Sequence, residues 1–362
     1  MRVLLAGGGT AGHINPAVSI ADTIKRKQPD SEFLFVGTKN GMESTLVPKE
    51  GYNIEFIEVS GFKRKLTPKN IMAVLKAFAA CGKCRGIIKK FKPDVVIGTG
   101  GYVSGPLLFA ASSMKVPTLI HEQNVFAGLT SKMLSDRVDT VCISFEESRK
   151  RFEKAKNIVL TGNPIRQELF ELSYERAREK LGIDQKPLLV AFGGSLGATR
   201  LNESMVEYIK SVPEGKCNIL FATGEREYAT VSKALAGVSK KCVTVVKYIY
   251  NMNEVMQAAD LLVCRAGAIT VSELNALGKP SVLIPSPNVT DNHQFFNAKA
   301  LVDKNAAVMI EEKDLNNKQF CKTVNSLLEN REKLKEMSGC SKKMGIRNSN
   351  ELIYNEIKKI IQ

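Results

Sequence analysis

The sequence lacks an uninterrupted hydrophobic run long enough to cross a membrane. Its longest stretch without a charged residue, Val95 to Met114, contains five glycine or proline residues, so it is not expected to form a spanning helix. The N-terminal residues Val3-Leu4-Leu5-Ala6 predict a strand and not a signal peptide. We therefore expect a cytoplasmic protein whose membrane association, where it occurs, is peripheral.

Patterns typical of metal sites and disulfides are scarce. The eight cysteines are scattered, mostly inside apolar runs, which is typical of buried thiols in a reducing compartment. Only Cys81 and Cys84 form a C-x-x-C pair, and no second pair or nearby histidine accompanies them. The sequence also contains no D-x-D pair and no spaced His, Asp or Glu ligands, which argues against a metal-bound diphosphate. We predict no metal site and no cofactor.

Acidic residues are missing from one long segment. The chain carries 52 Lys and Arg against 37 Asp and Glu, and the 31 residues from Phe62 to Lys92 hold ten of these cations and no acid. A basic surface that includes apolar side chains suits an anionic membrane, whereas no nucleic-acid-binding module or aromatic stacking platform is recognisable. The alternative is an ordinary amphipathic helix on a core. The predicted membrane patch comprises Lys63, Arg64, Lys65, Lys69, Ile71, Leu75 and Phe78.

The length and the order of apolar runs predict two α/β domains. A chain of 362 residues exceeds one typical core, and unbroken apolar strands flanked by helices imply parallel sheets covered on both faces. The alternation restarts near Lys186, so we expect residues 1–163 to form one domain, joined by a C-terminal helix at 345–362, and residues 164–344 to form the other. Expected strands lie at 2–6, 32–36, 53–59, 94–98, 117–120, 138–143, 157–160, 187–192, 217–222, 242–247, 260–264, 281–284 and 306–310.

The loop after the first strand literally matches a dinucleotide fingerprint. Gly7-x-Gly9-x-x-Gly12 lies between a strand and a helix, but the second strand ends in Gly37-Thr38 without the acid that a dinucleotide ribose requires. The loop therefore predicts either a tight turn or a site for a diphosphate or an acceptor phosphate at a helix N-terminus.

The loop at the start of the second domain offers a rival function. Gly193-Gly194-Ser195-Leu196-Gly197 spells the nucleophile elbow of a serine hydrolase, and Asp260 and His293 follow in triad order. Against this, the motif opens the second sheet and no His-Gly-Gly oxyanion loop precedes it. The Ser195 hydroxyl can instead donate to a phosphate oxygen.

A further loop, Cys264 to Glu273, follows an expected strand and begins a helix. Arg265 and the helix N-terminus would supply positive potential for a diphosphate, and the Glu273 carboxylate could accept two ribose hydroxyls. A capping box formed by Thr270 and Glu273 is the alternative interpretation.

All three histidines, His13, His121 and His293, fall in loops that follow strands. This clustering favours a catalytic role for at least one of them. His13 is the candidate general base, and His121 and Glu122 are the second candidates.

Six ordered motifs together resemble one family over nearly the whole chain. They are Gly7-Gly8-Gly9-Thr10-Ala11-Gly12-His13-x-x-Pro16, Gly100-Gly101-Tyr102-Val103-Ser104-Gly105-Pro106, His121-Glu122-Gln123-Asn124, Gly162-Asn163-Pro164-x-Arg166, Gly193-Gly194-Ser195-x-Gly197-Ala198 and Arg265-x-Gly267-Ala268-x-Thr270-Val271-Ser272-Glu273. They resemble the MurG family, glycosyltransferase family 28, whose members are UDP-N-acetylglucosamine (UDP-GlcNAc) transferases that convert lipid I to lipid II for peptidoglycan synthesis.

The resemblance implies a GT-B fold, in which two Rossmann-like domains face a cleft, the first for the lipid-linked acceptor and the second for the nucleotide sugar. It implies inverting, metal-independent transfer at the cytoplasmic face of the cell membrane, with UDP-GlcNAc, lipid I, an anionic phospholipid surface and a cell-wall synthesis complex as partners. The residues it places around UDP-GlcNAc are Thr10, Ala11, Gly12, Asn124, Arg166, Ser195, Ile249, Ala268, Ile269, Thr270, Val271, Ser272, Glu273 and Gln294.

The chain departs from the family pattern at three positions, Ala11, Ser131 and His293. None of the three removes a charge that the mechanism needs, so they bear on sugar contacts more than on the reaction. A related glycolipid transferase, such as a diacylglycerol glycosyltransferase, is the main alternative.

Overall fold

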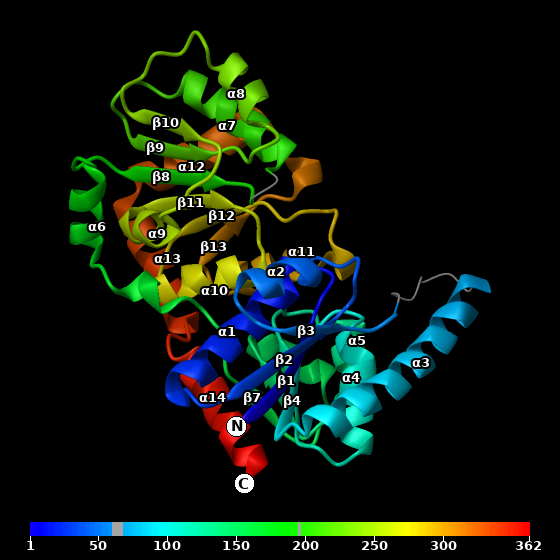
Figure 1. Cartoon of the computed structure of the whole chain (residues 1–362). Coiled ribbons are helices and arrows are strands. Elements are labelled where there is room, and N and C mark those ends of the chain that lie inside the picture. The colour runs from blue at the N-terminus through cyan, green and yellow to red at the C-terminus, as the bar shows by residue number, and fades with distance from the viewer. Residues whose placement is uncertain (60–67, 195–196) are drawn as a thin grey trace. The chain divides into compact units, whose positions relative to one another are not determined.

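The chain folds into two compact units (Figure 1). The computed structural model describes residues 1–59, 68–194 and 197–362, with the backbone alone for 68–75. Unit 1 comprises Met1–Ile165 and Asn348–Gln362, and unit 2 comprises Arg166–Arg347. The C-terminal helix thus belongs to the same unit as the N-terminal strand.

Unit 1 is built on a seven-stranded sheet in which all neighbouring strands run parallel, in the order β3-β2-β1-β4-β5-β6-β7. Its strands are β1 (Arg2–Gly7), β2 (Glu32–Gly37), β3 (Ile54–Phe56), β4 (Val95–Gly100), β5 (Thr118–Glu122), β6 (Thr140–Ile143) and β7 (Ile158–Leu160). Its helices are α1 (Ala11–Lys27), α2 (Glu43–Lys49), α3 (Pro68–Phe91), α4 (Ser104–Ser113), α5 (Leu129–Leu134), the 3-10 helix η1 (Glu146–Arg151) and α14 (Ser349–Ile361).

Unit 2 repeats this plan with a six-stranded parallel sheet in the order β10-β9-β8-β11-β12-β13. Its strands are β8 (Leu188–Phe192), β9 (Asn218–Ala222), β10 (Val243–Val246), β11 (Leu261–Cys264), β12 (Ser281–Leu283) and β13 (Ala307–Met309). Its helices are α6 (Tyr174–Leu181), α7 (Thr199–Ser211), α8 (Tyr228–Ala234), α9 (Met252–Ala258), α10 (Ala268–Leu277), α11 (His293–Val302), α12 (Asn317–Glu329) and α13 (Arg331–Met344), with 3-10 helices η2 (Gln167–Phe170), η3 (Thr290–Asn292) and η4 (Glu312–Asp314).

These sheets confirm the predicted fold class of two doubly wound, Rossmann-like parallel sheets. Each strand range expected from the sequence overlaps an observed strand, because every range is an apolar or β-branched run bounded by turn residues. The largest difference is at 53–59, where pairing with β2 is limited to Ile54–Phe56.

Both faces of the first sheet are buried, as the unbroken apolar runs predict. Along β1, Val3 and Leu5 join one hydrophobic cluster, whereas Leu4 and Ala6 join another on the opposite face. The C-terminal helix α14 completes the first cluster, since Ile353 and Ile357 are buried in it. The C-terminal helix therefore packs on the unit that contains the N-terminal strand.

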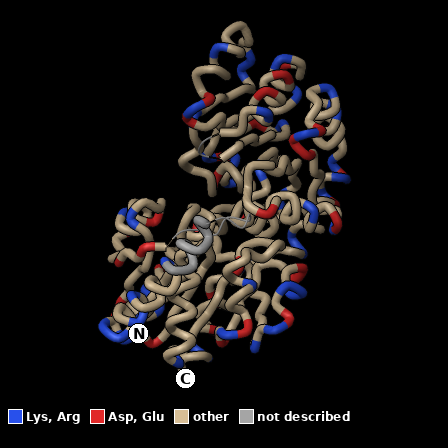
Figure 2. Tube along the Cα trace, turned by 90° about the vertical axis from the view of Figure 1, so that its right-hand side faces the viewer, with Lys and Arg blue, Asp and Glu red and all other residues tan. Residues whose placement is uncertain are grey.

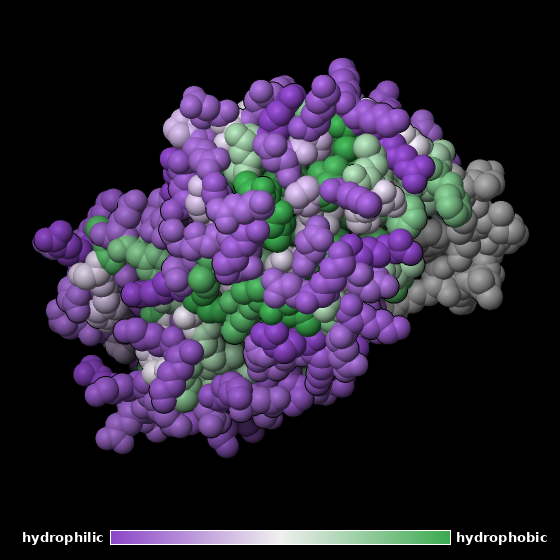
Figure 3. All heavy atoms as spheres, turned by 90° about the horizontal axis from the view of Figure 1, so that it is seen from below, coloured by the Kyte–Doolittle hydropathy of each residue, from purple (hydrophilic) through white to green (hydrophobic). Residues whose placement is uncertain are grey.

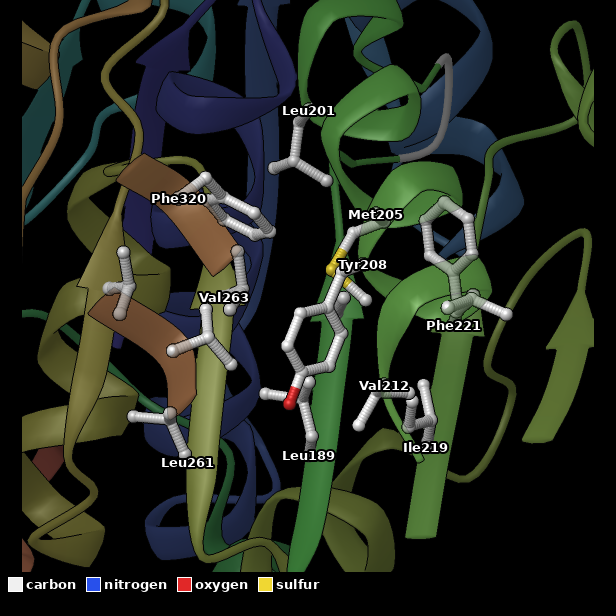
Figure 4. Close-up of a cluster of buried hydrophobic side chains, with 14 of the residues drawn as sticks. Leu189, Leu201, Met205, Tyr208, Val212, Ile219, Phe221, Leu261, Val263 and Phe320 are labelled. Carbon is white, nitrogen blue, oxygen red and sulfur yellow. The ribbon is translucent and has the colours of Figure 1, made fainter. Parts of the chain in front are cut away.

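The core of unit 2 lies between its sheet and the helices α7 and α12 (Figure 4). Tyr208 from α7 is fully buried there beside Phe320 from α12, and its hydroxyl donates to Asn325 Oδ1 at 3.1 Å. Because the buried hydroxyl is paired, the ring adds apolar area without an unsatisfied polar group.

The basic segment coincides in part with helix α3. Ala80, Cys84, Ile87 and Ile88 lie at helical spacing and are buried in the core of unit 1. On the other side Phe78 is 69% exposed, and Lys76, Lys83, Arg85, Lys89 and Lys90 are also exposed. Of the predicted membrane patch, Lys63, Arg64 and Lys65 lie outside the described residues, and Lys69, Ile71 and Leu75 lie where the backbone alone is described.

Charges of both signs are interspersed along the traced chain (Figure 2). On the face shown in Figure 3, hydrophilic side chains cover most of the surface and hydrophobic ones lie in bands between them. Among the described residues, no helix is both long and apolar enough to span a bilayer.

Candidate active site

The two topological switch points are the natural ligand sites of this fold. In unit 1 the strand order reverses between β1 and β4, and in unit 2 it reverses between β8 and β11. In open α/β sheets, ligands bind beyond the carboxyl ends of the strands at such points. The loops that begin at Gly8, Gly101, Gly193 and Arg265 follow these strands, so the sequence-predicted loops lie where ligands are expected.

His13 lies at the switch point of unit 1, in the first turn of α1. Its Nδ1 lies 3.0 Å from the Thr99 carbonyl oxygen at the end of β4 and 3.0 Å from Gln123 Oε1. The residue is partly exposed, and within the described part of the chain Nε2 has no hydrogen-bond partner. The ring is therefore held through one nitrogen and presents the other, as a general base requires.

Two glycines allow this arrangement. A Cβ at Gly7 would lie 2.2 Å from Thr99 Oγ1, which donates to the His13 carbonyl oxygen at 2.7 Å. A Cβ at Gly100, whose φ is +109°, would lie 2.7 Å from His13 Nδ1. Gly7, one of the glycines that resembled a dinucleotide fingerprint, thus lets β4 approach the start of α1 closely, and Gly100 on β4 leaves room for the His13 ring.

His121, the second candidate base, is completely buried on β5. Its Nε2 lies 2.9 Å from the Gly162 carbonyl oxygen, and Gln123 Nε2 lies 2.9 Å from its Nδ1. Burial lowers its pKa to about 4 despite the bond to Gly162, so the ring stays neutral. Because both ring nitrogens are occupied inside the fold, the structure does not support His121 as a base that contacts substrate.

Glu122 is also held inside the fold. Its carboxylate accepts the backbone N–H groups of Asn124, at 3.2 Å, and Gly128, at 3.0 Å, together with the Asn124 side-chain amide at 3.4 Å. The side chain therefore organises the loop after β5, including Asn124, and the expectation of a base at Glu122 is not supported either.

The burial of His121 makes a pH-dependent prediction. The unfolded residue titrates near 6.5 and the folded one near 4, so protons bind preferentially to the unfolded chain between these values. The free energy of unfolding is expected to fall by up to about 3 kcal/mol from this residue as the pH drops from 6.5 to 4. Urea unfolding at pH 7 and pH 5 should show a smaller difference for His121→Gln than for the wild type. An unchanged difference in His121→Gln would contradict this, and His293→Gln serves as the matched control.

Glu43, a residue that the sequence analysis missed, supports the same glycine loop. Its buried carboxylate accepts the N–H of Gly9 at 3.1 Å and both the N–H and the hydroxyl of Thr38, at 2.9 and 2.7 Å. Burial acts to raise its pKa, but these hydrogen bonds lower it overall. A Cβ at Gly8 or Gly41 would overlap this carboxylate. The glycines at positions 8 and 41 were the available signal of a close approach in this loop. Nothing in the sequence indicates that Glu43 is the side chain that approaches them.

Unit 2 has a pocket of about 190 Å³ beside its switch point. It is lined by the buried Ile249, by Phe192 at the end of β8, and by Thr270 and Glu273 of α10. Lys247, Tyr248 and Tyr250, which the sequence analysis missed, also line it. They follow β10, so the rule that ligand loops follow strands could have found them. A lining of apolar and aromatic side chains with a few polar groups is typical of a small-molecule site.

Arg166 and Glu273 meet in this pocket. Arg166 Nε and Nη2 each lie 3.1 Å from Glu273 Oε1. Burial raises the pKa of Glu273, and the Arg166 guanidinium partly offsets this effect. Helix α10 begins at Ala268 with Gly267 as its N-cap, so the alternative of a Thr270–Glu273 capping box is not observed. Ile269, Val271 and Ser272 occupy the same first turns.

Arg265 does not line this pocket. Its guanidinium forms an ion pair with Glu312 and donates to the carbonyl oxygens of Ile284 and Pro285, at 3.1 and 3.2 Å. It therefore holds the ends of neighbouring loops together. The cations that line the pocket are Arg166 and Lys247.

The remaining predicted residues have varied surroundings. Gln294 Oε1 accepts the Ser286 N–H at 2.9 Å, which joins α11 to the loop after β12. Asp291 and Asn292, just before α11, have φ of +54° and +51°, a strained backbone typical of functional loops. Thr10 is the N-cap of α1, Ala11 and Gly12 lie in its first turn, and Ser195 lies outside the described residues.

The serine hydrolase alternative is contradicted by Asp260. Asp260 precedes β11, whereas Gly193 follows β8, and the two strands are parallel neighbours. The two residues therefore lie at opposite ends of these strands. The Asp260 carboxylate accepts Arg178 Nη1 at 2.8 Å and the Leu188 N–H at 2.7 Å. It therefore cannot orient a catalytic histidine at the loop that begins at Gly193.

Comparison with known proteins decides the family. The family model for the glycosyltransferase family 28 N-terminal domain matches residues 3–143, and that for the C-terminal domain matches residues 188–353. The chain belongs to glycosyltransferase family 28. Family membership confirms the resemblance drawn from the six motifs.

Curated relatives match over the full length. A UDP-N-acetylglucosamine--N-acetylmuramyl-(pentapeptide) pyrophosphoryl-undecaprenol N-acetylglucosamine transferase from Acetivibrio thermocellus is 50% identical over 100% of this chain and 99% of its own. A protein of the same name from Caldanaerobacter subterraneus is 48% identical over 99% of this chain.

Solved structures agree. The crystal structure of Acinetobacter baumannii MurG is 30% identical, with a TM-score of 0.83 over 99% of both chains. A UDP-GlcNAc 2-epimerase from Neisseria meningitidis, 14% identical with a TM-score of 0.68, shares the fold. The match to MurG supports the GT-B fold class.

Proposed function

We propose that this chain transfers N-acetylglucosamine from UDP-GlcNAc to the 4-hydroxyl of the N-acetylmuramyl residue of lipid I, with inversion, giving lipid II. The observation that carries the proposal is His13, which lies at the switch point of the first sheet with one ring nitrogen anchored and the other without a partner among the described residues. The full-length similarity to relatives named for this reaction supports the choice of substrates.

The donor is assigned to unit 2. Uracil would lie on Ile249, the ribose hydroxyls would donate to Glu273, and the diphosphate would lie at the N-terminus of α10, with Arg166 and Lys247 as nearby cations. The resemblance to the family adds the Ser195 hydroxyl as a donor to the diphosphate. Thr10, Ala11, Gly12, Asn124 and Gln294 would contact the sugar. The side chain of Glu273 is buried, so hydrogen bonds to it are shielded from water.

His13 is assigned as the base that removes the proton from the acceptor hydroxyl. The hydroxyl oxygen attacks the anomeric carbon, the bond from that carbon to the diphosphate oxygen breaks, and UDP leaves with the electron pair. General base catalysis of this kind contributes roughly 10²–10⁴-fold.

We assign stabilisation of the negative charge on the departing UDP to the N-terminus of α10 and to the nearby cations, with no metal ion taking part. The sequence has no D-x-D pair, and helix N-termini bind phosphate through their amides and dipole. Transfer of labelled N-acetylglucosamine to a short-chain lipid I analogue in the presence of a chelator tests both the reaction and its independence of metal. Absence of transfer would disprove the function, and loss of transfer on chelation alone would disprove the metal-free mechanism.

The same assay with diacylglycerol as acceptor tests the glycolipid alternative. Transfer to diacylglycerol and not to the lipid I analogue would favour that alternative. A full-length match to proteins named for the lipid I reaction makes the opposite result the expected one.

The basic segment is proposed to bind the anionic cytoplasmic face of the membrane. Each cation near such a surface contributes roughly 1 kcal/mol. Reversing the charge of Lys63, Arg64, Lys65, Lys69 and Lys76 is expected to release the protein from phosphatidylglycerol vesicles in a sedimentation assay. UDP binding, assigned to unit 2, should stay unchanged. Equal vesicle binding by the variant and the wild type would contradict this role.

A further inference from the structure

A chain of hydrogen bonds connects His13 to the buried interior of unit 1. His13 Nδ1 lies 3.0 Å from Gln123 Oε1, Gln123 Nε2 lies 2.9 Å from His121 Nδ1, and His121 Nε2 lies 2.9 Å from the Gly162 carbonyl oxygen. The three side chains come from α1, the end of β5 and β5 itself. Gln123 and His121 are 1% and 0% exposed, so bulk water does not compete for these bonds.

The carbonyl groups at the two ends fix where the hydrogens lie. The Gly162 oxygen can only accept, so His121 Nε2 carries the proton and, in the neutral ring, His121 Nδ1 accepts. Gln123 Nε2 therefore donates to His121 Nδ1, and also to the His121 carbonyl oxygen at 2.8 Å. Its Oε1 is then left to accept from His13.

The same orientation follows from the other end. The Thr99 carbonyl oxygen, 3.0 Å from His13 Nδ1, can only accept, so that nitrogen carries a proton. Both ends agree on one tautomer of His13, with the proton on Nδ1 and the lone pair on Nε2. A single consistent assignment is what a fully satisfied buried network requires.

We propose that Gln123 and His121 are positioning residues that lock His13 in the tautomer whose Nε2 accepts the proton of the acceptor hydroxyl. This inference rests on the proposed function. Neither Gln123 nor His121 contacts substrate in this proposal. The buried His121, which cannot act as a base on the substrate, instead helps to position His13. Asn163 helps to hold this chain of hydrogen bonds in place, because its side-chain amide donates to the Gln123 carbonyl oxygen at 3.0 Å.

The proton movement balances on these atoms. The acceptor hydroxyl transfers its proton to His13 Nε2 as its oxygen bonds to the anomeric carbon, and the carbon–oxygen bond to UDP breaks. His13 becomes an imidazolium that keeps its Nδ1 proton between the Thr99 and Gln123 oxygens. It later releases the Nε2 proton to water, which restores the starting tautomer.

The side chain that accepts from His13 Nδ1 is the neutral amide of Gln123 and not a carboxylate. A carboxylate beside an imidazole favours the protonated ring and removes the base at low pH. The Gln123 amide orients the ring without adding a charge, so the ring stays available as a base. Replacing the amide of Gln123 by a carboxylate should therefore change the pH dependence of transfer if Gln123 positions the base, and should not do so if Gln123 only supports the fold.

Nitrogen NMR on the wild-type protein tests the tautomer directly. The chain has three histidines, so selective ¹⁵N-histidine labelling gives few signals, and His13→Gln and His121→Gln spectra assign them. We expect a protonated Nδ1 and an unprotonated Nε2 in His13, and the reverse in His121. The opposite tautomer in His13 would overturn the proposal whether or not the protein transfers sugar.

Kinetics of Gln123 variants provide the second test. Gln123→Met, which keeps the length but not the hydrogen bonds, should lower kcat about tenfold with the KM for UDP-GlcNAc unchanged. Gln123→Glu should move the acidic limb of the pH–kcat profile up by one to three pH units. An unmoved limb in a folded Gln123→Glu variant would overturn the proposal.

The same charge change at the exposed Gln319 of α12 is the matched control. Gln319→Glu should leave the pH–kcat profile unchanged, and a shift equal to that of Gln123→Glu would overturn the proposal. Failure of the proposed function is distinguishable, because it would abolish transfer in the wild type and leave the NMR result unaffected.

Discussion

His13→Ala is expected to lower kcat roughly 10²–10⁴-fold, which corresponds to about 3–5 kcal/mol of transition-state stabilisation. The variant removes the only candidate base that is partly exposed and has a ring nitrogen without a partner in the described structure. The measurement is single-turnover transfer to a lipid I analogue at saturating donor. Binding of UDP by calorimetry should be unchanged, since the nucleotide is assigned to unit 2.

His13→Gln refines this test. Glutamine can still donate to the Thr99 and Gln123 oxygens but is not basic at neutral pH, so it should preserve the loop while it loses kcat as the alanine variant does. Near-normal turnover in His13→Gln would show that the basicity of the His13 ring is not needed for transfer. Near-normal turnover in His13→Ala, in a variant that unfolds at the wild-type temperature, would remove His13 from the mechanism.

The fold could be predicted because the signal for it is local. Each strand is a short apolar run, and burial on both faces follows from runs such as Val3-Leu4-Leu5-Ala6 without reference to any partner. The limit of local reasoning shows at β3, where the run 53–59 continues past the three residues that pair with β2. Strand length there depends on the neighbouring strand, which the segment itself does not specify.

The site could be predicted only as far as loop position allows. The rule that ligands bind after strands places His13 and Glu273 correctly beside the two switch points. Loop position does not indicate which side chains are buried, so the sequence alone cannot distinguish His121 and Glu122 from His13 as candidate bases. It also misplaces Arg265, whose partner Glu312 lies 47 residues further along the chain. Pairings across such separations come from tertiary packing.

Glu273→Gln is expected to weaken UDP binding by about 10–150-fold, since hydrogen bonds to a charged group contribute about 1.5–3 kcal/mol. The carboxylate is the acidic group of the pocket in unit 2 and would accept both ribose hydroxyls. Glutamine has the same shape but only one accepting oxygen. Calorimetric titration with UDP measures the loss, and thermal unfolding checks that Arg166, which remains half-exposed, tolerates the change.

A nucleotide that lacks one ribose hydroxyl separates a direct contact from a general loss of the pocket. If Glu273 binds the ribose, 2′-deoxy-UDP should bind the wild type more weakly than UDP, and Glu273→Gln should discriminate much less between the two. Equal discrimination by both proteins would place the carboxylate away from the ribose. Glu332→Gln on α13, an exposed position of the same unit, is the control and should bind both nucleotides as the wild type does. Because the two measurements share one pocket, the difference between their binding free energies isolates the pairing itself.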